Sequence, residues 1–242
     1  MTLQQLMSPI RRAIDEYEMI SEGDKIAVGL SGGKDSIALL SALAGIRRFY
    51  PKKFTLVAIT IDTGLDFDEN EKRALEEYVK SLGVEYFVVK TEIAKVVFEM
   101  RKESNPCSLC ANMRRGALNG AAKELGCNKV ALGHHGDDLV ETFFLSMLYE
   151  GRLSTFHPIT TLSRADLSVI RPMIYARERD IASFSKGKPI LHNPCPANKH
   201  TKREYVKDLL KQVRVEIPFA SENILNALTN EDRTNLFKKQ KK

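Results

Sequence analysis

A glycine-rich hexapeptide at residues 31–36, Ser-Gly-Gly-Lys-Asp-Ser, combines residue types that can bind phosphate. It follows an apolar run at residues 25–30 and precedes a helical pattern that begins at Lys34. Helix N-termini favour bound anions, glycines allow close backbone approach, and serine hydroxyls can donate hydrogen bonds. The segment lacks the glycine spacing and the Gly-Lys-Ser/Thr ending of the Walker pattern. We therefore predict a phosphate cradle of another type, with a serine-capped turn as the structural alternative.

The cysteines form a second candidate group. Cys107 and Cys110 make a C-x-x-C pair, and Cys195 lies far downstream. Such a pair can be a redox couple, half of a zinc site, or part of the ligand set of an iron–sulfur cluster. Three thiolates would leave one iron of a four-iron cluster open, or one position of a zinc ion. Cys127 follows a predicted helix end and enters an apolar strand, so we expect a small buried side chain there.

Polar residues also follow two of the predicted strands. Asp62 ends the second strand, where either a structural or a nucleotide-facing role is possible for an aspartate. After the fourth strand comes a cluster made of His134, His135, Asp137 and Asp138. Aspartates there can cap the following helix, or they can hold Mg²⁺ directly or through water beside a phosphate.

The elements that position these residues alternate between strands and helices. After an N-terminal helix we predict strands at 25–30, 54–61, 84–89 and 129–132, with helices at 34–49, 69–82, 111–125 and 139–149 between and after them. Beyond residue 151 we predict an edge strand at 168–174 and helices at 177–186, 202–213 and 222–228.

This alternation predicts an α/β fold with a doubly wound parallel sheet and a helical C-terminal extension, because parallel strands need crossover helices. Ligands bind such sheets beyond the carboxyl ends of the strands, where residues 31–36, 62–64 and 133–135 would converge. We expect an N-terminal helix at residues 1–20, a nucleotide-binding domain with a cysteine insertion at 21–175, and a helical extension with a basic tail at 176–242.

The composition is that of a globular protein, with 43% hydrophobic and 28% charged residues. No apolar run approaches the roughly 20 residues that span a bilayer, and the amphipathic N-terminus does not resemble a signal peptide. We therefore expect a cytoplasmic protein without membrane contact, in which the cysteines serve metal binding or catalysis rather than structural disulfides. The net charge of +6 is compatible with a polyanionic partner such as RNA.

Four motifs carry a resemblance to a known family. They are SGGKDS at 31–36, Cys107-Ser-Leu-Cys110 running into Ala-Asn-Met-Arg-Arg-Gly-Ala-Leu, the segment Leu132-Gly-His-His-Gly-Asp-Asp-Leu-Val-Glu-Thr142, and Asn193-Pro-Cys195. The first resembles the pyrophosphate loop of the PP-loop ATPases. Together, over about residues 25–210, they resemble the tRNA 2-thiocytidine synthetase (TtcA) family. One departure follows Cys195, where Pro-Ala-Asn-Lys-His replaces the family's Pro-Cys-Ser-Gly type of ending.

The resemblance implies an adenine nucleotide alpha-hydrolase-like fold and an ATP-dependent sulfurtransferase. Such an enzyme adenylates a carbonyl oxygen of a tRNA base, releases pyrophosphate and AMP, and leaves a thiolated base, here 2-thiocytidine. It implies a [4Fe–4S] cluster on Cys107, Cys110 and Cys195. It implies catalytic roles for Lys34, Asp35 and Asp62, and contacts to MgATP from Ser31, Gly32, Gly33, Lys34, Asp35, Ser36, Ile61, Gly133, His134, Asp137 and Asp138. A cysteine desulfurase or other donor would supply sulfide. A homodimer is one possible oligomeric state.

Three other readings of the motifs remain open. The same adenylation could end in thiolation of a small molecule, or in attack by a nitrogen nucleophile, although the three cysteines disfavour nitrogen transfer. A zinc-stabilised RNA-binding module would bind zinc and form no AMP. A cluster enzyme that removes sulfur from thiolated bases would not need the phosphate loop, which this chain retains.

Overall fold

The computed structural model describes residues 1–101, 106–163, 165–195 and 202–233. The described chain divides into two compact units, Met1–His135 with His157–Lys199, and Gly136–Phe156 with His200–Lys242. The basic tail predicted at 238–242 lies outside the described residues. Among the residues that are described, none of the helices combines the length and apolarity needed to cross a membrane.

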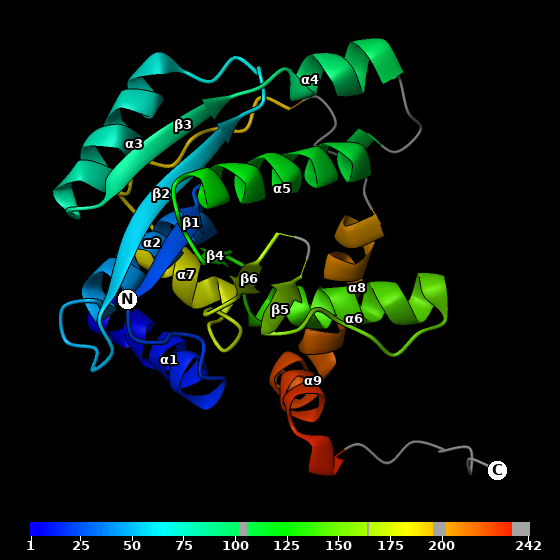
Figure 1. The fold of residues 1–242 in the computed structure, drawn as a ribbon. Coiled ribbons are helices and arrows are strands. Elements are labelled where there is room, and N and C mark those ends of the chain that lie inside the picture. Colours follow the sequence, from blue (N-terminus) through cyan, green and yellow to red (C-terminus); the bar gives the residue numbers. More distant parts are fainter. Residues whose placement is uncertain (102–105, 164, 196–201, 234–242) are drawn as a thin grey trace. The chain divides into compact units, whose positions relative to one another are not determined.

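The first unit is built on a mixed sheet, which confirms the predicted α/β fold (Figure 1). Its strand order is β3-β2-β1-β4-β6-β5, and the pairs are parallel except for antiparallel β5–β6. The strands are β1 Asp24–Gly29, β2 Phe54–Asp62, β3 Glu85–Lys90, β4 Lys129–Ala131, β5 Ile159–Leu162 and β6 Leu167–Ile170. Because β1 has β2 on one side and β4 on the other, the chain reverses its strand order beside β1, where ligands of such sheets bind.

One strand prediction was wrong. The segment predicted as an edge strand at 168–174 forms β6, which ends at Ile170 and lies between β4 and β5. The true edge strand is β5, with the sequence Ile-Thr-Thr-Leu. Four residues with little alternation of polarity give a weak strand signal, so the sequence pattern did not predict β5.

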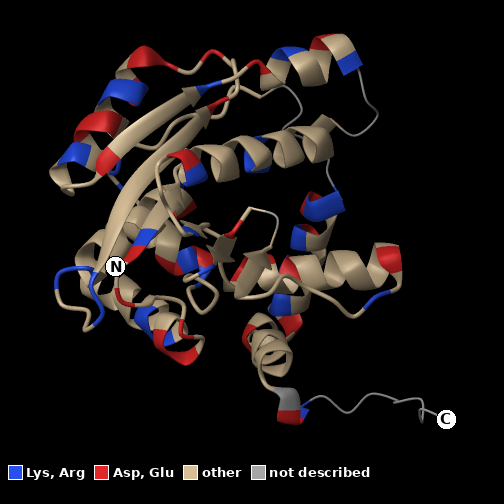
Figure 2. Cartoon of the chain, in the orientation of Figure 1, with Lys and Arg blue, Asp and Glu red and all other residues tan. Residues whose placement is uncertain are grey.

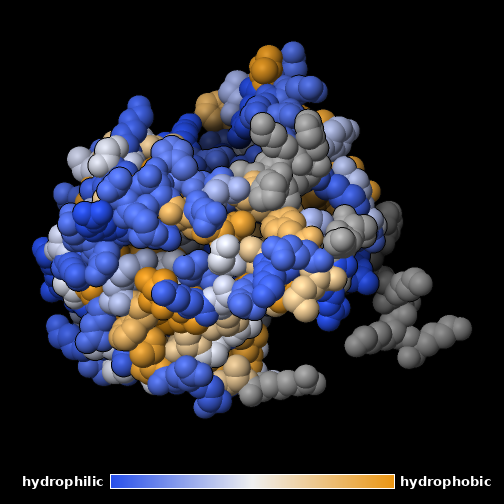
Figure 3. All heavy atoms as spheres, turned by 90° about the horizontal axis from the view of Figure 1, so that it is seen from above, coloured by the Kyte–Doolittle hydropathy of each residue, from blue (hydrophilic) through white to orange (hydrophobic). Residues whose placement is uncertain are grey.

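The helices of the first unit are α1 Leu3–Glu16, α2 Lys34–Ile46, α3 Glu69–Ser81, α4 Ile93–Lys95, α5 Pro106–Glu124 and α7 Glu178–Phe184, with a π-helix at Val96–Arg101. Acidic and basic residues alternate in groups along α3 (Figure 2). Their side chains form local pairs such as Lys72–Glu69 and Lys80–Glu76. Figure 3 shows hydrophilic side chains over much of the face that it presents, with apolar side chains in smaller patches.

Helix α2 is apolar on all sides and is buried almost entirely from Ser36 to Ile46. Such a helix needs cover on every face, and α1 and α7 both pack against it. Its N-terminus, which begins inside the 31–36 loop at Lys34, is therefore held by the core packing of the helix. The loop is thus continuous with a closely packed, buried helix.

Helix α5 packs against the sheet through Leu118 and Ala122, in a core cluster with Val57, Val130 and Cys127. Cys127 is buried, and burial raises the pKa of its thiol. The prediction of a small buried side chain at this position is confirmed.

The second unit contains α6 Gly136–Glu150, α8 Lys202–Glu216 and α9 Ala220–Thr229, followed by a 3-10 turn at Glu231–Arg233. Its core is formed by Leu139, Val140, Val206, Leu210 and Leu225. Since α6 packs with α8 and α9, the helix that follows β4 belongs with the C-terminal helices.

Candidate nucleotide and cysteine site

The 31–36 loop is closed by its two serines. Ser36 Oγ donates to the Gly33 carbonyl at 2.9 Å, and the Ser31 amide and hydroxyl both lie 3.2 Å from Ser36 Oγ. Gly33 is the N-cap of α2 and offers no side chain to the first-turn amides. Those amides and the positive end of the helix dipole suit an anion. The serine hydroxyls therefore shape the cradle in this structure.

Gly32 lets another segment pack directly on the loop. Its φ is +77°, and a Cβ at this position would lie 2.4 Å from Cδ1 of Leu191. The Leu191 amide also donates to the Gly32 carbonyl at 3.0 Å. Residues 191–195, which end at Cys195, are thus fixed at their start to the phosphate loop.

Lys34 is held by two carboxylates. Its Nζ lies 2.9 and 3.1 Å from the two oxygens of Asp35 and 3.2 Å from Oε1 of Glu178 in the first turn of α7. Burial alone would lower the pKa of Lys34, but the hydrogen bonds and charges of Asp35 and Glu178 raise it above the usual lysine value. The ammonium is therefore the stable form beside the loop.

The segment after β4 meets the same loop. A Cβ on Gly133 would lie 3.1 Å from the Asp35 carbonyl carbon, so only glycine permits this approach without a shift. Buried His135 places Nε2 3.7 Å from Oδ1 of Asp35. The structure thus brings Gly133, next to His134, against the loop, as expected from the convergence of strand ends.

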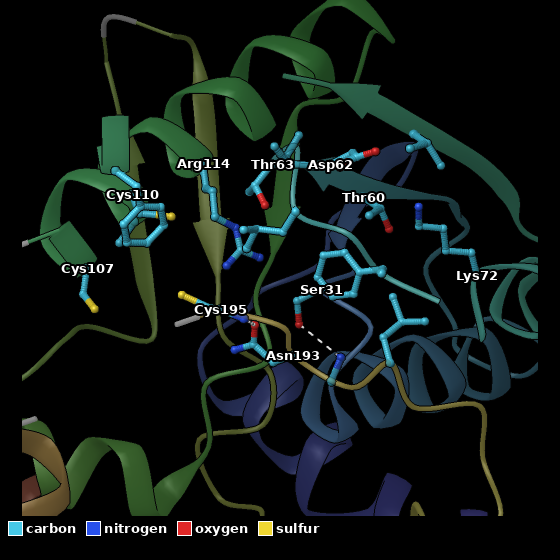
Figure 4. Close-up of a pocket in the computed structure, with 18 of the residues that line it drawn as sticks. Ser31, Thr60, Asp62, Thr63, Lys72, Cys107, Cys110, Arg114, Asn193 and Cys195 are labelled. Atoms are coloured by element: carbon cyan, nitrogen blue, oxygen red, sulfur yellow. Dashed lines mark hydrogen bonds between the residues drawn. The ribbon is translucent and has the colours of Figure 1, made fainter. Parts of the chain in front are cut away.

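A cavity of about 540 Å³ lies in the first unit. Seven of the predicted site residues line it: Ser31, Gly33, Ile61, Asp62, Cys107, Cys110 and Cys195. Figure 4 shows the three cysteines toward one end, Thr60 and Lys72 toward the other, and the Arg114 side chain extending between them. One cavity therefore joins the phosphate loop to the cysteines.

Asp62 shapes the turn at the end of β2. Its Oδ1 accepts from the Gly64 amide at 3.0 Å, and its carbonyl accepts from the Thr91 amide at 2.9 Å. Lys72 faces the same cavity from α3. The hydrogen bond from Lys72 to Glu69 is the main cause that raises the pKa of Lys72. This end of the cavity thus offers a carboxylate and an ammonium to a ligand.

Cys107 and Cys110 lie in the first turns of α5, although the sequence pattern predicted a helix only from residue 111. Pro106 opens the helix, and proline suits the first helical position because it has no amide hydrogen to leave unpaired. Helical spacing then places Cys107, Cys110 and Arg114 on one face, toward the cavity. The helix prediction started too late because this proline was not read as a start signal.

Cys110 lies in a partly buried position among the cavity residues. Burial is the main cause that raises the pKa of Cys110, Arg114 opposes it, and Cys195 and Cys107 add to it. The Cys195 amide donates to Oδ1 of Asn193 at 3.1 Å. Within the described ranges no three His, Cys, Asp or Glu side chains stand close enough to hold a metal ion. The cysteines share a cavity wall, but they are not gathered into a tight cluster.

His192 ties the cysteine-bearing segment to α3. Its amide donates to Oε2 of Glu71 at 2.9 Å, and its ring Nδ1 contacts Oε1 of the same residue. The backbone hydrogen bond from His192 is the main cause that lowers the pKa of Glu71, and the bond to Glu71 raises the pKa of His192. Residues 191–195 are therefore held to both the loop and α3.

Asp137 and Asp138 belong to the second unit, where they meet basic residues of α8. Arg203 Nη1 lies 3.4 Å from Asp138 Oδ1 and 3.0 Å from Glu141 Oε2, and Arg214 Nη1 lies 4.0 Å from Asp137 Oδ1. Burial is the main cause that raises the pKa of Glu141. In this structure the predicted Mg²⁺ carboxylates are thus engaged in ion pairs within their own unit.

Comparison with known proteins assigns the family. The PP-loop domain family matches residues 3–219. The tRNA-cytidine(32) 2-sulfurtransferase of Pelobacter propionicus is 40% identical over 232 residues, which cover 94% of this chain and 86% of that protein. The enzyme of the same name from Alcanivorax borkumensis is 42% identical over 224 residues, covering 90% and 78%. The chain belongs to the tRNA-cytidine(32) 2-sulfurtransferase family. The resemblance inferred from the sequence motifs is confirmed.

A solved structure agrees with the fold of this family member. The U34-tRNA thiolase NcsA from Methanococcus maripaludis, solved with its [4Fe-4S] cluster, superimposes with a TM-score of 0.76 at 23% identity. The match covers 93% of this chain and 76% of that one. The two chains therefore share a fold at low sequence identity.

Sequence reasoning missed several residues around the site of this 2-sulfurtransferase family member. Contacts between distant segments involve Glu178, Glu71 and His192. No local sequence pattern predicts such contacts. Arg114 could have been found, because it follows Cys110 at a helical spacing of four. Phe98 lines the cavity from the π-helix, a type of element that is frequent at functional sites.

Proposed function

We propose that the chain is an ATP-dependent tRNA sulfurtransferase that adenylates a base carbonyl oxygen and replaces it with sulfur, forming 2-thiocytidine at cytidine 32. The observation that carries this proposal is the single cavity that both the phosphate loop and the three cysteines line. Activation by ATP and delivery of sulfur must occur on the same base, so one cavity has to serve both. We take the proposed substrate, cytidine 32 of tRNA, from the names of the relatives.

The 31–36 loop binds the triphosphate in this proposal. Its amides lie at the N-terminus of α2, where an anion would bind, and Lys34 adds a positive charge that Asp35 positions. Charge spreads over the phosphate oxygens as the base attacks the α-phosphate and pyrophosphate leaves. Loss of one such charge-stabilising contact costs about 10²–10³ in rate. Mg²⁺ would accompany ATP. Asp62, for which a catalytic role near the ATP phosphates is expected, lies on the cavity wall.

The cysteines fit the ligand set of an iron–sulfur cluster. Thiolates are the usual protein ligands of such clusters, and three thiols lie on one cavity wall, while Cys127 is buried in the core. Cys107, Cys110 and Cys195 would hold the group. When bound, a [4Fe–4S] cluster would supply one iron without a protein ligand, available to the sulfur that is transferred. The charge of Arg114 opposes the rise that burial causes in the pKa of Cys110.

The reaction also needs partners. Sulfide must come from a donor such as a cysteine desulfurase, and ATP and tRNA meet in the cytoplasm, where we place the enzyme. The paired carboxylates and lysines on α3 show that charges of both signs surround the cavity. Recognition of tRNA would thus combine attraction to basic residues with exclusion by acidic ones.

The test is mass spectrometry of tRNA nucleosides from cells that lack the gene. We expect 2-thiocytidine to disappear, to return with the wild-type gene, and to stay absent with Lys34→Ala. The variant should keep the circular dichroism and the iron content of the wild type, because Lys34 faces the loop rather than the core. Lys80→Ala, which removes an exposed lysine paired with Glu76, is the matched control and should restore the nucleoside. Unchanged 2-thiocytidine in the deletion strain would refute the proposed substrate.

A further inference from the structure

Helix α7 holds Lys34 at two points. Glu178 Oε1, in its first turn, lies 3.2 Å from Lys34 Nζ, and the hydroxyl of Ser185, at its end, donates to the Lys34 carbonyl at 3.2 Å. Buried Ile181 and Phe184 fix the helix, which packs against α2 (Figure 1). Helix α7, which lies outside the phosphate loop, therefore contacts both the backbone carbonyl and the side chain of Lys34 and helps to fix their positions.

The ammonium of Lys34 is surrounded by acceptors. A lysine ammonium carries three N–H donors. Three carboxylate oxygens lie close to Nζ, two from Asp35 at 2.9 and 3.1 Å and one from Glu178 at 3.2 Å. A phosphate oxygen that binds Lys34 therefore competes with these acceptors.

Glu178 is the acceptor that can be exchanged at the lower cost. Asp35 is the neighbouring residue of the loop and moves with Lys34, whereas Glu178 arrives from another helix and makes the longest of the three contacts. The side chains of Lys34 and Glu178 are 30% and 37% exposed, so solvent screens their attraction. A triphosphate brings more negative charge than one carboxylate, and both form charge-assisted bonds with an ammonium.

We propose that Glu178 is a positioning residue that holds the Lys34 ammonium in the nucleotide-free protein and yields it to the triphosphate of ATP. While the loop is empty, the contact with Glu178 keeps the Lys34 side chain ordered and charged. It also makes ATP binding weaker than the loop alone would allow, because every bound nucleotide must first displace Glu178. The inference rests on the proposed function only in taking ATP as the ligand of the 31–36 loop.

The test measures binding of α,β-methylene ATP, which cannot be cleaved between the α and β phosphates, in the absence of tRNA. Glu178→Gln keeps the size of the side chain and removes its charge, so we expect the Kd to fall by about 1.5- to 5-fold, the range of exposed ion pairs. Asp180→Asn is the matched control, since it removes the same charge from the same helix at a carboxylate that pairs with Arg179. Its Kd should match that of the wild type.

The same substitution in a protein that lacks Lys34 separates two causes of a lower Kd. One is release of the Lys34 ammonium, and the other is the loss of repulsion between the Glu178 carboxylate and the triphosphate. In a Lys34→Met protein, the gain from Glu178→Gln should shrink, because there is no ammonium to release. An equal or larger gain in that background, or a Kd that is unchanged or raised by Glu178→Gln alone, would overturn the proposal. If Glu178→Gln does not fold, Glu178→Asp gives the same test, because its shorter side chain withdraws from Nζ. Failure of the wild type to bind the analogue would instead refute ATP as the ligand, and with it the proposed function.

Discussion

Replacing Gly32 with alanine tests how tightly the Cys195 segment is packed on the phosphate loop. Two costs follow from the structure. The φ of +77° lies in the left-handed region, which costs a residue with a side chain about 1–2 kcal/mol. The new methyl group would also lie 2.4 Å from Leu191 Cδ1, and overpacking of this kind costs about 1–3 kcal/mol. Gly32→Ala should therefore lower the free energy of unfolding by about 2–5 kcal/mol in urea denaturation.

Gly187 separates the two costs. Its φ is +75°, but nothing lies within 4 Å of the position that a Cβ would take. Gly187→Ala should thus show the backbone cost alone, about 1–2 kcal/mol. Adding Leu191→Ala to Gly32→Ala should remove the two closest contacts, to Cδ1 and Cγ, while the contact to Leu191 Cβ at 2.9 Å stays. Part of the loss should therefore be recovered, beyond what the two changes would give independently. If Gly32→Ala costs no more than Gly187→Ala, Leu191 does not pack on the loop and the described coupling is wrong.

Three further predictions concern the cysteines, the binding of tRNA, and the contact between His192 and Glu71 of α3. Protein prepared without oxygen should be brown, and iron should be lost on replacement by alanine of any one of Cys107, Cys110 and Cys195. Cys127→Ala should keep the iron, because this thiol lies in the core, and stoichiometric zinc instead of iron would contradict the cluster. The Kd for tRNA should rise more than about tenfold between 50 and 200 mM salt, as expected when several basic residues release counterions from phosphates, and a flat dependence would favour a small-molecule substrate. Glu71 raises the pKa of His192 above 6.5, so this pair stabilises the folded chain below that pH while Glu71 is ionised, and the contribution is lost as the pH rises through the raised value. Glu71→Gln should therefore lower the pKa of His192 in an NMR titration, and an unchanged value would show that the contact does not form in solution.

Much of the fold could be predicted because its signals are local. The parallel core follows from short apolar runs that alternate with helices, and the all-apolar α2 announces its own burial. The phosphate loop was recognisable because two glycines and a lysine at a strand-to-helix turn form a compact pattern. Strand β5 was missed because four residues of mixed polarity carry no period, and only pairing with β6 makes them a strand.

The arrangement of the site could be predicted only in part. Strand order brings residue 62 and residue 133 near the loop, so their approach follows from topology. The partners of Lys34 do not follow in the same way, because Glu178 reaches it from a helix more than a hundred residues downstream. The contact between Leu191 and Gly32 is likewise a matter of three-dimensional packing. Such pairings depend on the complete chain, which the sequence pattern describes only one segment at a time.

The wide separation of the cysteines along the chain has a consequence for biogenesis. Two arrive on α5, between β3 and β4, and the third arrives on a segment that follows β6 and rests on the 31–36 loop. During synthesis the first pair leaves the ribosome well before the third, and no complete set of thiols exists until the sheet has closed around β1 and β4. A chain whose segment after β6 is not yet made can offer a metal only two of the three proposed ligands. The native topology brings the third to the same cavity, so the colour of the proposed centre would report how many molecules in a preparation hold all three thiols together.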